Sequence, residues 1–356
     1  KEKPQAKCKC GGKLIGEERV FDTWFDSSIS PLYILGYERH KDFFKKAFPC
    51  TLRPQGKEIV RTWLYYTLLR SWQLTEKAAF EDVWINFHIV DADGRKMSKS
   101  LGNVVDPLKV IEKNGSESFR LWAVIEGNIT KQDLRCSEEK IAAEFKTLIK
   151  FWNVAKFVSS FKLKGQPKLT ETDRLFMNEI NELIEFSDKG YATYNFFEPA
   201  TKLRHFLWEL FASHYIELVK ARAYNSEKKF TIEEQAAAAF TLHYCLQNLL
   251  KLLSPIIPLI TYKLYKDIYG KNIHEEKFPK AAKPFPIKAR LADLIEVTSF
   301  IWKAKKDKGL SLKTAVKSIS LPKKFENLKP LLADLIAAHN ASEIKFENTK
   351  EIKIRF

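Results

Sequence analysis

The chain has 356 residues, 45% of them hydrophobic and 29% charged, a balance typical of a globular protein and not of a disordered one. No apolar run reaches about 18 residues, and the first residues lack an apolar core, so we expect neither a membrane span nor a secretory signal. Sixty basic residues against 44 acidic ones give a formal net charge of +16, which favours a polyanionic partner, most simply nucleic acid; a merely basic protein is the equal alternative on charge alone.

The first 15 residues contain two closely spaced cysteines, Cys8 and Cys10, in the stretch CKCGG. This pattern is typical of half a zinc knuckle, in which the remaining two ligands would come from elsewhere. The alternative is a pair of incidental surface cysteines. The five cysteines of the chain have no regular spacing, which argues against a disulfide framework and for a reducing compartment such as the cytoplasm.

Residues 16–134 mix strand and helix patterns. Apolar residues recur at helical spacing over 57–75, and the apolar, β-branched run 82–90 predicts a strand that ends before an Asp-Gly turn. Residues 106–127 predict two short helices broken at Asn-Gly. Strands and helices joined by polar loops at the strand ends indicate a doubly wound α/β layer.

The stretch DGRKMSKSLGN, residues 93–103, predicts a mobile basic loop after that strand. Its two lysines, Lys96 and Lys99, could engage a phosphate chain, and the hydroxyls of Ser98 and Ser100 could donate hydrogen bonds to phosphate oxygens. Lysines that engage as charge grows on a leaving pyrophosphate would stabilise the transition state more than the ground state. On composition alone, a solvated basic loop is the alternative.

Residues 135–279 predict an antiparallel helical bundle, because apolar residues recur every three or four positions in four long segments. These segments are 138–161, 172–196, 198–224 and 232–269. A proline- and lysine-rich linker follows at 278–290. Residues 288–356 predict a small α+β appendix with a helix over 288–308, a strand at 317–322, a helix over 326–340 and a strand at 351–356.

Several motifs in this order resemble the class I aminoacyl-tRNA synthetases that handle branched aliphatic amino acids. KMSKS (96–100) resembles the second signature of that class. Further matches are VFDTWFDSSISPL (20–32), RPQGKEIVRTWLYY (53–66), KNGSESFRLW (113–122), FWNVAKFV (151–158), FLWELFASHYIELVKAR (206–222) and LLSPIIPLIT (252–261). Within this branch, DTWF and RPQG resemble the valyl enzymes of the archaeal kind, and an isoleucyl enzyme is the alternative.

The resemblance implies an amino-acid pocket walled by Trp24, Ile59 and Trp63, an apolar slot that suits an isopropyl group. Such a slot discriminates poorly against an isostere that bears a hydroxyl group. Trp63 alone would otherwise be interpreted as a core aromatic residue.

An ATP site is implied by the same resemblance. Gly56 and Glu58 match the segment that approaches the adenylate ribose, although Glu58 replaces the usual aspartate. The backbone of His88, Ile89 and Val90 would lie near adenine, at the strand end where open α/β sheets bind ligands. Lys96 and Lys99 would complete the site.

The implied reaction joins valine to tRNA(Val) through valyl-adenylate, with ATP and Mg²⁺ as cofactors and no protein nucleophile. The bundle would bind the anticodon, with basic residues on phosphates and some aromatic residues on splayed bases. The candidate basic residues are Lys146, Lys150, Lys156, Arg204, Lys220 and Arg222. Most of the bundle aromatics are expected to be core.

The largest departures from the class concern the N-terminal part. The seven histidines form no His-x-Gly-His signature, and the first half of the nucleotide fold and the editing insertion have no counterpart. The sequence therefore predicts the C-terminal half of a Rossmann-like catalytic domain, whose N-terminal half would come from a partner or from a longer sequence. Alone, the chain should not make the adenylate. The other hypothesis is a non-catalytic tRNA-binding module, which would have no use for an intact KMSKS stretch.

Overall fold

The computed structural model describes residues 8–128, 130–163 and 165–356, so residues 1–7 of the expected zinc knuckle lie outside it. The chain divides into two compact units. The first runs to Val90 and takes in a short segment that ends at Leu134, and the second comprises Asp91–Asn128 and Arg135–Phe356. None of the helices in the described ranges is long and apolar enough to cross a membrane.

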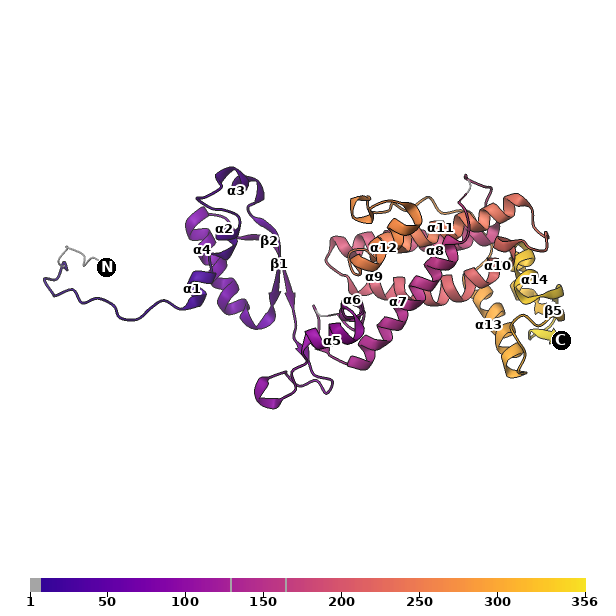
Figure 1. Cartoon of the computed structure of the whole chain (residues 1–356), viewed down its shortest axis with the longest axis horizontal. Helices are drawn as coiled ribbons and strands as arrows, with labels where there is room; N and C mark the ends of the chain where they lie inside the picture. The colour runs from indigo at the N-terminus through magenta and orange to yellow at the C-terminus, as the bar shows by residue number, and fades with distance from the viewer. Residues whose placement is uncertain (1–7, 129, 164) are drawn as a thin grey trace. The chain divides into compact units, whose positions relative to one another are not determined.

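The first unit is built on a β-α-β segment (Figure 1). Strands β1 (Cys50–Gly56) and β2 (Phe80–Asn86) pair in parallel, with Cys50 opposite Phe80 and Gly56 opposite Asn86. Helix α4 (Tyr65–Thr75) connects them, because parallel neighbours need a crossover. Three short helices precede the sheet: α1 (Thr23–Ser27), α2 (Ser30–Ile34) and α3 (Lys41–Ala47).

Both elements expected here are confirmed, with local differences. The helix predicted over 57–75 begins with a 3₁₀ turn, η1 (Lys57–Ile59), and a π-helical turn, η2 (Val60–Leu64), before α4 becomes regular. The strand predicted over 82–90 is interrupted at Phe87 and His88, and resumes as β3 (Ile89–Val90), which pairs with β4 (Leu134–Arg135).

The second unit begins with the basic loop, which contains one short 3₁₀ turn, η3 (Lys99–Leu101). Helices α5 (Pro107–Asn114) and α6 (Ser116–Ile125) follow, as predicted over 106–127. Gly115 separates them with φ of +80°, a conformation that favours glycine and explains the break at Asn-Gly.

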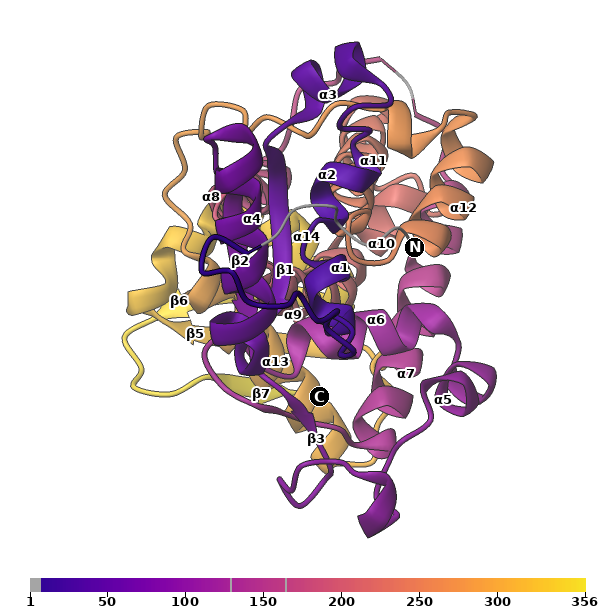
Figure 2. The same ribbon diagram turned by 90° about the vertical axis from the view of Figure 1, so that its left-hand side faces the viewer.

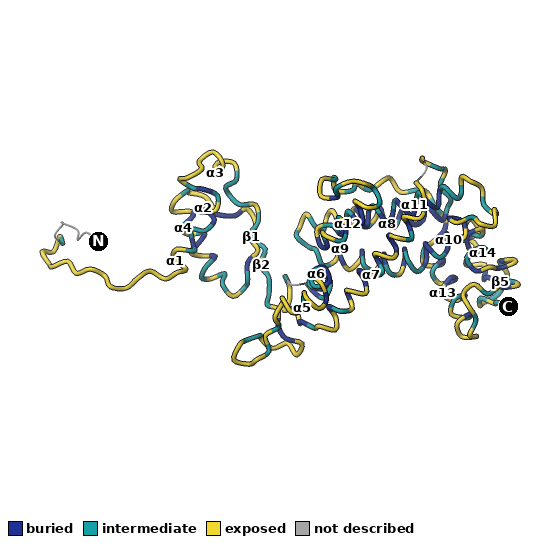
Figure 3. The backbone as a smooth tube through the Cα atoms, in the orientation of Figure 1, coloured by how far each residue is buried: buried dark blue, intermediate teal, exposed yellow. Residues whose placement is uncertain are grey.

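The helical bundle is also confirmed. Its helices lie side by side in Figures 1 and 3, with their buried faces turned toward one another. They are α7 (Glu138–Ser159), α8 (Glu171–Ala192), α9 (Phe197–His205), the π-helical η4 (Phe206–Tyr215), α10 (Ile216–Tyr224), α11 (Ile232–Leu253) and α12 (Pro258–Tyr269).

Local capping residues explain where two helices of the bundle begin. Thr170 with Asp173 and Thr231 with Glu234 form capping boxes at the starts of α8 and α11. The run expected over 232–269 is two helices, because Pro255 and Pro258 cannot donate the backbone hydrogen bonds of a continuous helix.

The C-terminal segment has the predicted α+β composition. A 3₁₀ turn, η5 (Ile273–Glu275), precedes it, and helix α13 (Leu291–Asp307) leads to β5 (Val316–Pro322), η6 (Lys323–Leu331), α14 (Leu332–His339), β6 (Ala341–Glu347) and β7 (Lys353–Arg355). Strand β5 lies between β6, which is parallel to it, and β7, which is antiparallel (Figure 2). One hydrophobic core runs from α6 and the bundle into this segment. The α/β plus all-α fold class predicted from the sequence is confirmed.

Candidate functional site

The basic loop is held at its base by one buried carboxylate, that of Asp91. Its Oδ1 accepts the backbone N–H groups of Asp93 and Arg95, at 3.1 and 2.7 Å. Its Oδ2 accepts the Arg95 Nε at 3.0 Å and the Asn103 Nδ2 at 2.8 Å. These donors, Asn103 first, lower the pKa of Asp91 to about 2, because they stabilise the carboxylate.

Asn103 holds the returning arm of this loop. Besides Asp91, its Nδ2 donates to the Lys96 carbonyl at 3.2 Å, and its Oδ1 accepts the Ser98 N–H at 2.9 Å. Gly94 and Gly102 turn the backbone at each end, with φ of +87° and +64°. The loop, residues 91–103, is therefore an ordered element and not an open coil. We call it the lysine loop.

The two lysines of this loop remain available. Lys96 and Lys99 are exposed, and neither ammonium group has an ion pair with any residue that the structure describes. The Ser98 Oγ lies 3.1 Å from the Ser100 Oγ and accepts the Leu101 N–H at 3.3 Å, so Ser98 caps η3. The backbone thus presents two exposed cations on an ordered hairpin, an arrangement that is chemically able to bind phosphate groups.

The first unit gathers the predicted ribose and adenine residues around Asp133. The His88 Nε2 lies 3.3 Å from the Glu58 Oε2, and the His88 backbone N–H donates to the Asp133 Oδ1 at 3.0 Å. The Lys57 Nζ donates to the same oxygen at 2.7 Å, and together these contacts, Lys57 first, lower the pKa of Asp133. A Cβ on Gly56 would lie 2.6 Å from the Glu58 Oε1, so the carboxylate folds over this glycine.

The predicted amino-acid pocket residues lie on α1, η1 and η2 of the same unit. The Trp63 Nε1 donates to the Ser27 Oγ at 3.0 Å, which ties the helix that carries Trp24 to the helix that carries Trp63. The Arg53 guanidinium lies over the Trp63 ring at 4.3 Å. Ile59 is half-buried and is the last residue of η1, four positions before Trp63 in the sequence.

Cys8 and Cys10 lie together in a turn closed by the Gly11 N–H on the Cys8 carbonyl. The Cys8 and Cys10 sulfur atoms lie 3.0 Å apart and share a hydrogen bond, and this neighbour lowers the pKa of Cys10. Two thiols are half of a tetrahedral zinc set. Among the described residues, no third histidine, cysteine, aspartate or glutamate joins them.

The bundle surface carries some of the expected basic residues. Lys146 and Lys156 are exposed on α7, where Phe145 and Trp152 are exposed as well. Lys150 lies over the Trp208 ring at 4.0 Å, and burial lowers its pKa. Two others are already paired: Arg204 Nε with Glu144 Oε2 at 3.0 Å, and Lys220 Nζ with Glu217 Oε1 at 3.1 Å.

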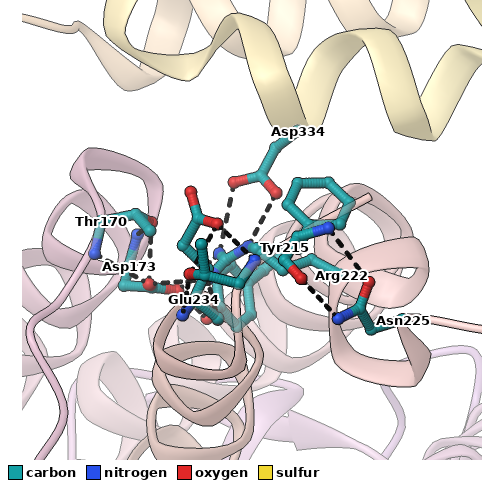
Figure 4. Close-up of polar contacts among 9 residues, drawn as sticks. Thr170, Asp173, Tyr215, Arg222, Asn225, Glu234 and Asp334 are labelled. Carbon is teal, nitrogen blue, oxygen red and sulfur yellow. Dashed lines mark hydrogen bonds and ion pairs between the residues drawn. The ribbon is translucent and has the colours of Figure 1, made fainter. Parts of the chain in front are cut away.

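Arg222 does not hold phosphate, and the sequence-based expectation for it is wrong. The side chain is 1% exposed and lies between two buried carboxylates (Figure 4). Its Nη1 and Nη2 donate to Asp173 at 2.9 and 2.8 Å, and its Nε donates to the Asp334 Oδ1 at 2.8 Å. The Tyr215 hydroxyl donates to Asp173 at 2.7 Å. Arg222 therefore joins α8, α10 and α14 inside the protein.

Asp133, Ser27 and the role of Asp91 were not recognised from the sequence. Asp91 adjoins the Asp-Gly turn and could have been suspected, because aspartate commonly accepts backbone N–H groups in turns. Asp133 bonds to His88, 45 positions away, and Ser27 bonds to Trp63, 36 positions away. No local sequence pattern indicates such distant partners.

Two family models match this chain. Residues 2–137 match the class I tRNA synthetases (I, L, M and V), and residues 173–320 match the anticodon-binding domain of tRNA ligases. Between them, these matches take in both the α/β part and the helical bundle.

The similar curated proteins include archaeal valine–tRNA ligases. The protein from Aeropyrum pernix is 41% identical over 96% of this chain, and that from Pyrobaculum aerophilum is 40% identical over 87%. The protein from Nanoarchaeum equitans is 38% identical over 93% of the chain. The chain spans 42%, 39% and 43% of these three relatives, which is well under half of each.

Solved structures share the fold at low sequence identity. LeuRS of Agrobacterium radiobacter K84, in a ternary complex with tRNA and LeuAMS, has a TM-score of 0.58 at 18% identity over 88% of this chain and 43% of its own. Methionyl-tRNA synthetase of Mycobacterium tuberculosis, in complex with methionyl-adenylate, has a TM-score of 0.57 at 19% identity over 74% of this chain and 54% of its own.

Proposed function

Because the chain belongs to the class I aminoacyl-tRNA synthetases, we propose that it supplies the lysine loop and the tRNA-binding bundle of an enzyme that joins valine to tRNA(Val). The valine specificity rests on relatives named as valine–tRNA ligases. An enzyme of this kind would act in the cytoplasm, where its ATP and tRNA are found.

The observation that carries the proposal is the state of the lysine loop. The side chains of Asp91 and Asn103 use both of their polar atoms in hydrogen bonds within the loop, whereas Lys96 and Lys99 are exposed and have no ion pair among the described residues. Fixed lysines suit a ligand whose negative charge must be met at a defined place.

In the proposed first step, a valine carboxylate oxygen bonds to the α-phosphorus of ATP while the bond to the bridging oxygen of pyrophosphate breaks. The Lys96 and Lys99 ammonium groups would stabilise the charge that develops on pyrophosphate. The terminal ribose hydroxyl of the tRNA then takes the acyl group, and AMP leaves. Ser98 and Ser100 would donate hydrogen bonds to phosphate oxygens.

The first unit would hold the rest of ATP and the amino acid. Glu58, close to Gly56 and His88, would accept hydrogen bonds from ribose hydroxyls. The backbone from His88 to Val90 would face adenine. Trp24, Ile59 and Trp63 would enclose the isopropyl group, with Trp63 oriented by Ser27.

Magnesium would have to be held mainly by the ATP phosphates. In the described part of the chain, no three carboxylates, histidines or cysteines lie together as a metal ligand set. Zinc fits better at the N-terminal turn, where the paired thiols of Cys8 and Cys10 would supply two of four ligands.

A further α/β segment would complete the nucleotide fold. Parallel sheets are normally covered on both faces. Here the two-stranded sheet of the first unit has a cluster of only three buried apolar residues among those described: Leu64, Ala79 and Phe80. Tyr65, Leu69 and Trp72 of α4 are exposed at helical spacing. This surface suits the half-domain that carries the first class I signature.

The test is valine-dependent exchange of pyrophosphate into ATP, with the chain alone and with a polypeptide that carries the His-x-Gly-His half of the fold. We expect exchange only when both are present. Robust exchange by the chain alone would refute the need for the second half. Binding of tRNA without exchange in any combination would favour the non-catalytic module.

A further inference from the structure

The break between α11 and α12, residues 254–257, brings a helix end close to a helix start that lacks a side-chain cap. At the end of α11, the Ser254 Oγ donates to the Lys251 carbonyl, and the Ile256 and Ile257 N–H groups donate to the Leu253 carbonyl. Helix α11 ends at Leu253, and α12 starts at Pro258, which has no N–H. The N-cap residue of α12 is Ile257, whose side chain cannot accept a hydrogen bond. Helix termini that lack such caps leave backbone groups in need of partners.

Two side chains of α6 supply these partners. The Glu117 Oε2 accepts the Ile260 N–H at 3.0 Å, at the third position of α12, where an N-cap side chain normally bonds. The Arg120 Nε donates to the Ile256 carbonyl at 2.7 Å, and its Nη2 donates to the Pro255 carbonyl at 3.2 Å. Helix α6 thus caps a break that lies more than 130 positions away in the sequence.

The charges of this pair suit the two ends that they meet. A helix N-terminus favours a carboxylate, and carbonyls beyond a helix C-terminus favour a cation. Glu117 and Arg120 are three positions apart and share one face of α6. Glu117 is also buried, and its Oε1 has no hydrogen-bond partner in the described protein, an arrangement that helix packing alone does not require.

The same helix is connected to the lysine loop. Asn103 is followed within four residues by Pro107, the start of α5, and the Met97 sulfur accepts the Val105 N–H at 3.5 Å. Helix α5 packs against α6, and α6 packs against α7, α9 and α12. Consistently, the lysine loop belongs to the same compact unit as the bundle.

One ion pair between this segment and α7 lies at the surface. The Lys113–Glu138 pair has a distance of 2.9 Å, but both side chains are more than half exposed. Exposed ion pairs contribute little to stability because water screens them. Glu117 and Arg120 make the directed side-chain contacts between α6 and the α11–α12 break. Glu117 is buried, the bonds of the Glu117 Oε2 and the Arg120 Nε are partly buried, and the bond of the Arg120 Nη2 is exposed.

We propose that Glu117 and Arg120 are positioning residues that link the bundle to the lysine loop, so that RNA bound to the bundle changes the order of the loop. This inference rests on the proposed function, because it requires RNA to engage the bundle. The coupling would act through the α11–α12 break and α6, without contact between the RNA and the loop.

The experiment measures hydrogen–deuterium exchange of the chain, with and without an RNA hairpin that contains a valine anticodon stem-loop. The reporting amides are those of Ser98 and Gly102, which donate to the Asn103 side chain and the Lys99 carbonyl. In the parent chain, saturating RNA should slow their exchange by about fivefold or more, the lower end of usual coupling factors.

The informative variants are Glu117→Ala and Arg120→Ala, with Glu117→Gln as a variant that keeps an acceptor. Both alanine variants should speed exchange of the loop amides without RNA and should abolish the effect of RNA while RNA still binds. Glu117→Gln should keep part of the effect. Thr231→Ala is the matched control, because it removes a cap at the other end of α11 and should leave the loop response intact.

The outcomes separate the two claims. If RNA binds the parent but leaves loop exchange unchanged, or if the alanine variants respond like the parent, the coupling is refuted and the proposed function stands. If RNA does not bind the parent chain, the RNA-binding part of the proposed function fails and the coupling falls with it. If an alanine variant does not fold, Glu117→Gln and Arg120→Lys decide between the same outcomes.

Discussion

Asn103 and Asp91 lie twelve positions apart, and the 2.8 Å hydrogen bond between them closes the base of the lysine loop. Because Asn103 also accepts the Ser98 N–H, one amide side chain fixes both arms. The position of Lys96 and Lys99 therefore depends on a residue that need not touch substrate.

Replacing Asn103 with alanine should leave binding of valine nearly unchanged and lower the rate of adenylate formation. The lysines would lose their defined position, and misplacement of catalytic groups commonly costs about 10- to 100-fold. Pyrophosphate exchange by the complete enzyme would give kcat and KM separately. Leu101→Ala, which removes an exposed side chain on the same loop, is the control, and an equal loss in both variants would contradict a special role for Asn103.

The bond between the Trp63 Nε1 and the Ser27 Oγ predicts a coupled effect on valine. Ser27→Ala and Trp63→Phe each remove this bond, so each should weaken valine binding by about 0.5–1.5 kcal/mol, the usual net contribution of one hydrogen bond. The double variant should be little worse than the single ones when KM for valine is measured in pyrophosphate exchange. Strict additivity would show that the bond does not orient Trp63.

Arg222 and the exposed lysines of α7 should behave in opposite ways. Arg222→Met leaves Asp173 and Asp334 buried without their cation and should destabilise the chain by about 3–5 kcal/mol in urea unfolding. Lys146→Ala and Lys156→Ala should leave stability nearly unchanged. Each should weaken binding of a tRNA(Val) transcript and lower the salt dependence of binding by about one unit of slope. Full stability of Arg222→Met would refute the buried network.

Glu179 gives a prediction about pH. Burial, with a smaller effect of Glu182, raises the pKa of Glu179 to about 7. The folded chain then binds more protons at this residue than the unfolded chain between about pH 4.5 and 7, so this contribution to stability falls as the pH rises through that range. Glu179→Gln, which resembles the protonated acid, should therefore raise Tm more at pH 8 than at pH 5.

The control for this titration is Glu182→Gln. Glu182 is exposed, so this change leaves the burial of Glu179 in place and removes only the smaller, charge-based cause of its raised pKa. An equal change of Tm at both pH values in Glu179→Gln would mean that Glu179 titrates normally in the folded chain.

The parts of this protein that depend on local sequence could be predicted. Asn114-Gly115 marked the break between α5 and α6, and Asp93-Gly94 marked the turn that opens the lysine loop. The bundle followed from helical spacing. Each of these features is decided by residues within one or two turns of one another.

The parts that depend on distant partners could not be predicted. In its local sequence, Arg222 resembles a surface cation on an amphipathic helix. Its partners Asp173 and Asp334 lie 49 and 112 positions away in the sequence. Glu117 caps a helix that starts more than 140 positions later, and no pattern in its own segment indicates this. The single run predicted over 232–269 is divided at Pro255 and Pro258, a local signal that the helical spacing on both sides concealed.

The most direct test of the account replaces Lys96 and Lys99 with alanine, singly and together, and measures valine-dependent pyrophosphate exchange and tRNA binding by the complete enzyme. We predict that each single variant lowers exchange by about 100-fold or more, as removal of one transition-state donor typically does, while tRNA affinity stays within about twofold. Unchanged exchange in the double variant would contradict a role for these lysines at the departing pyrophosphate.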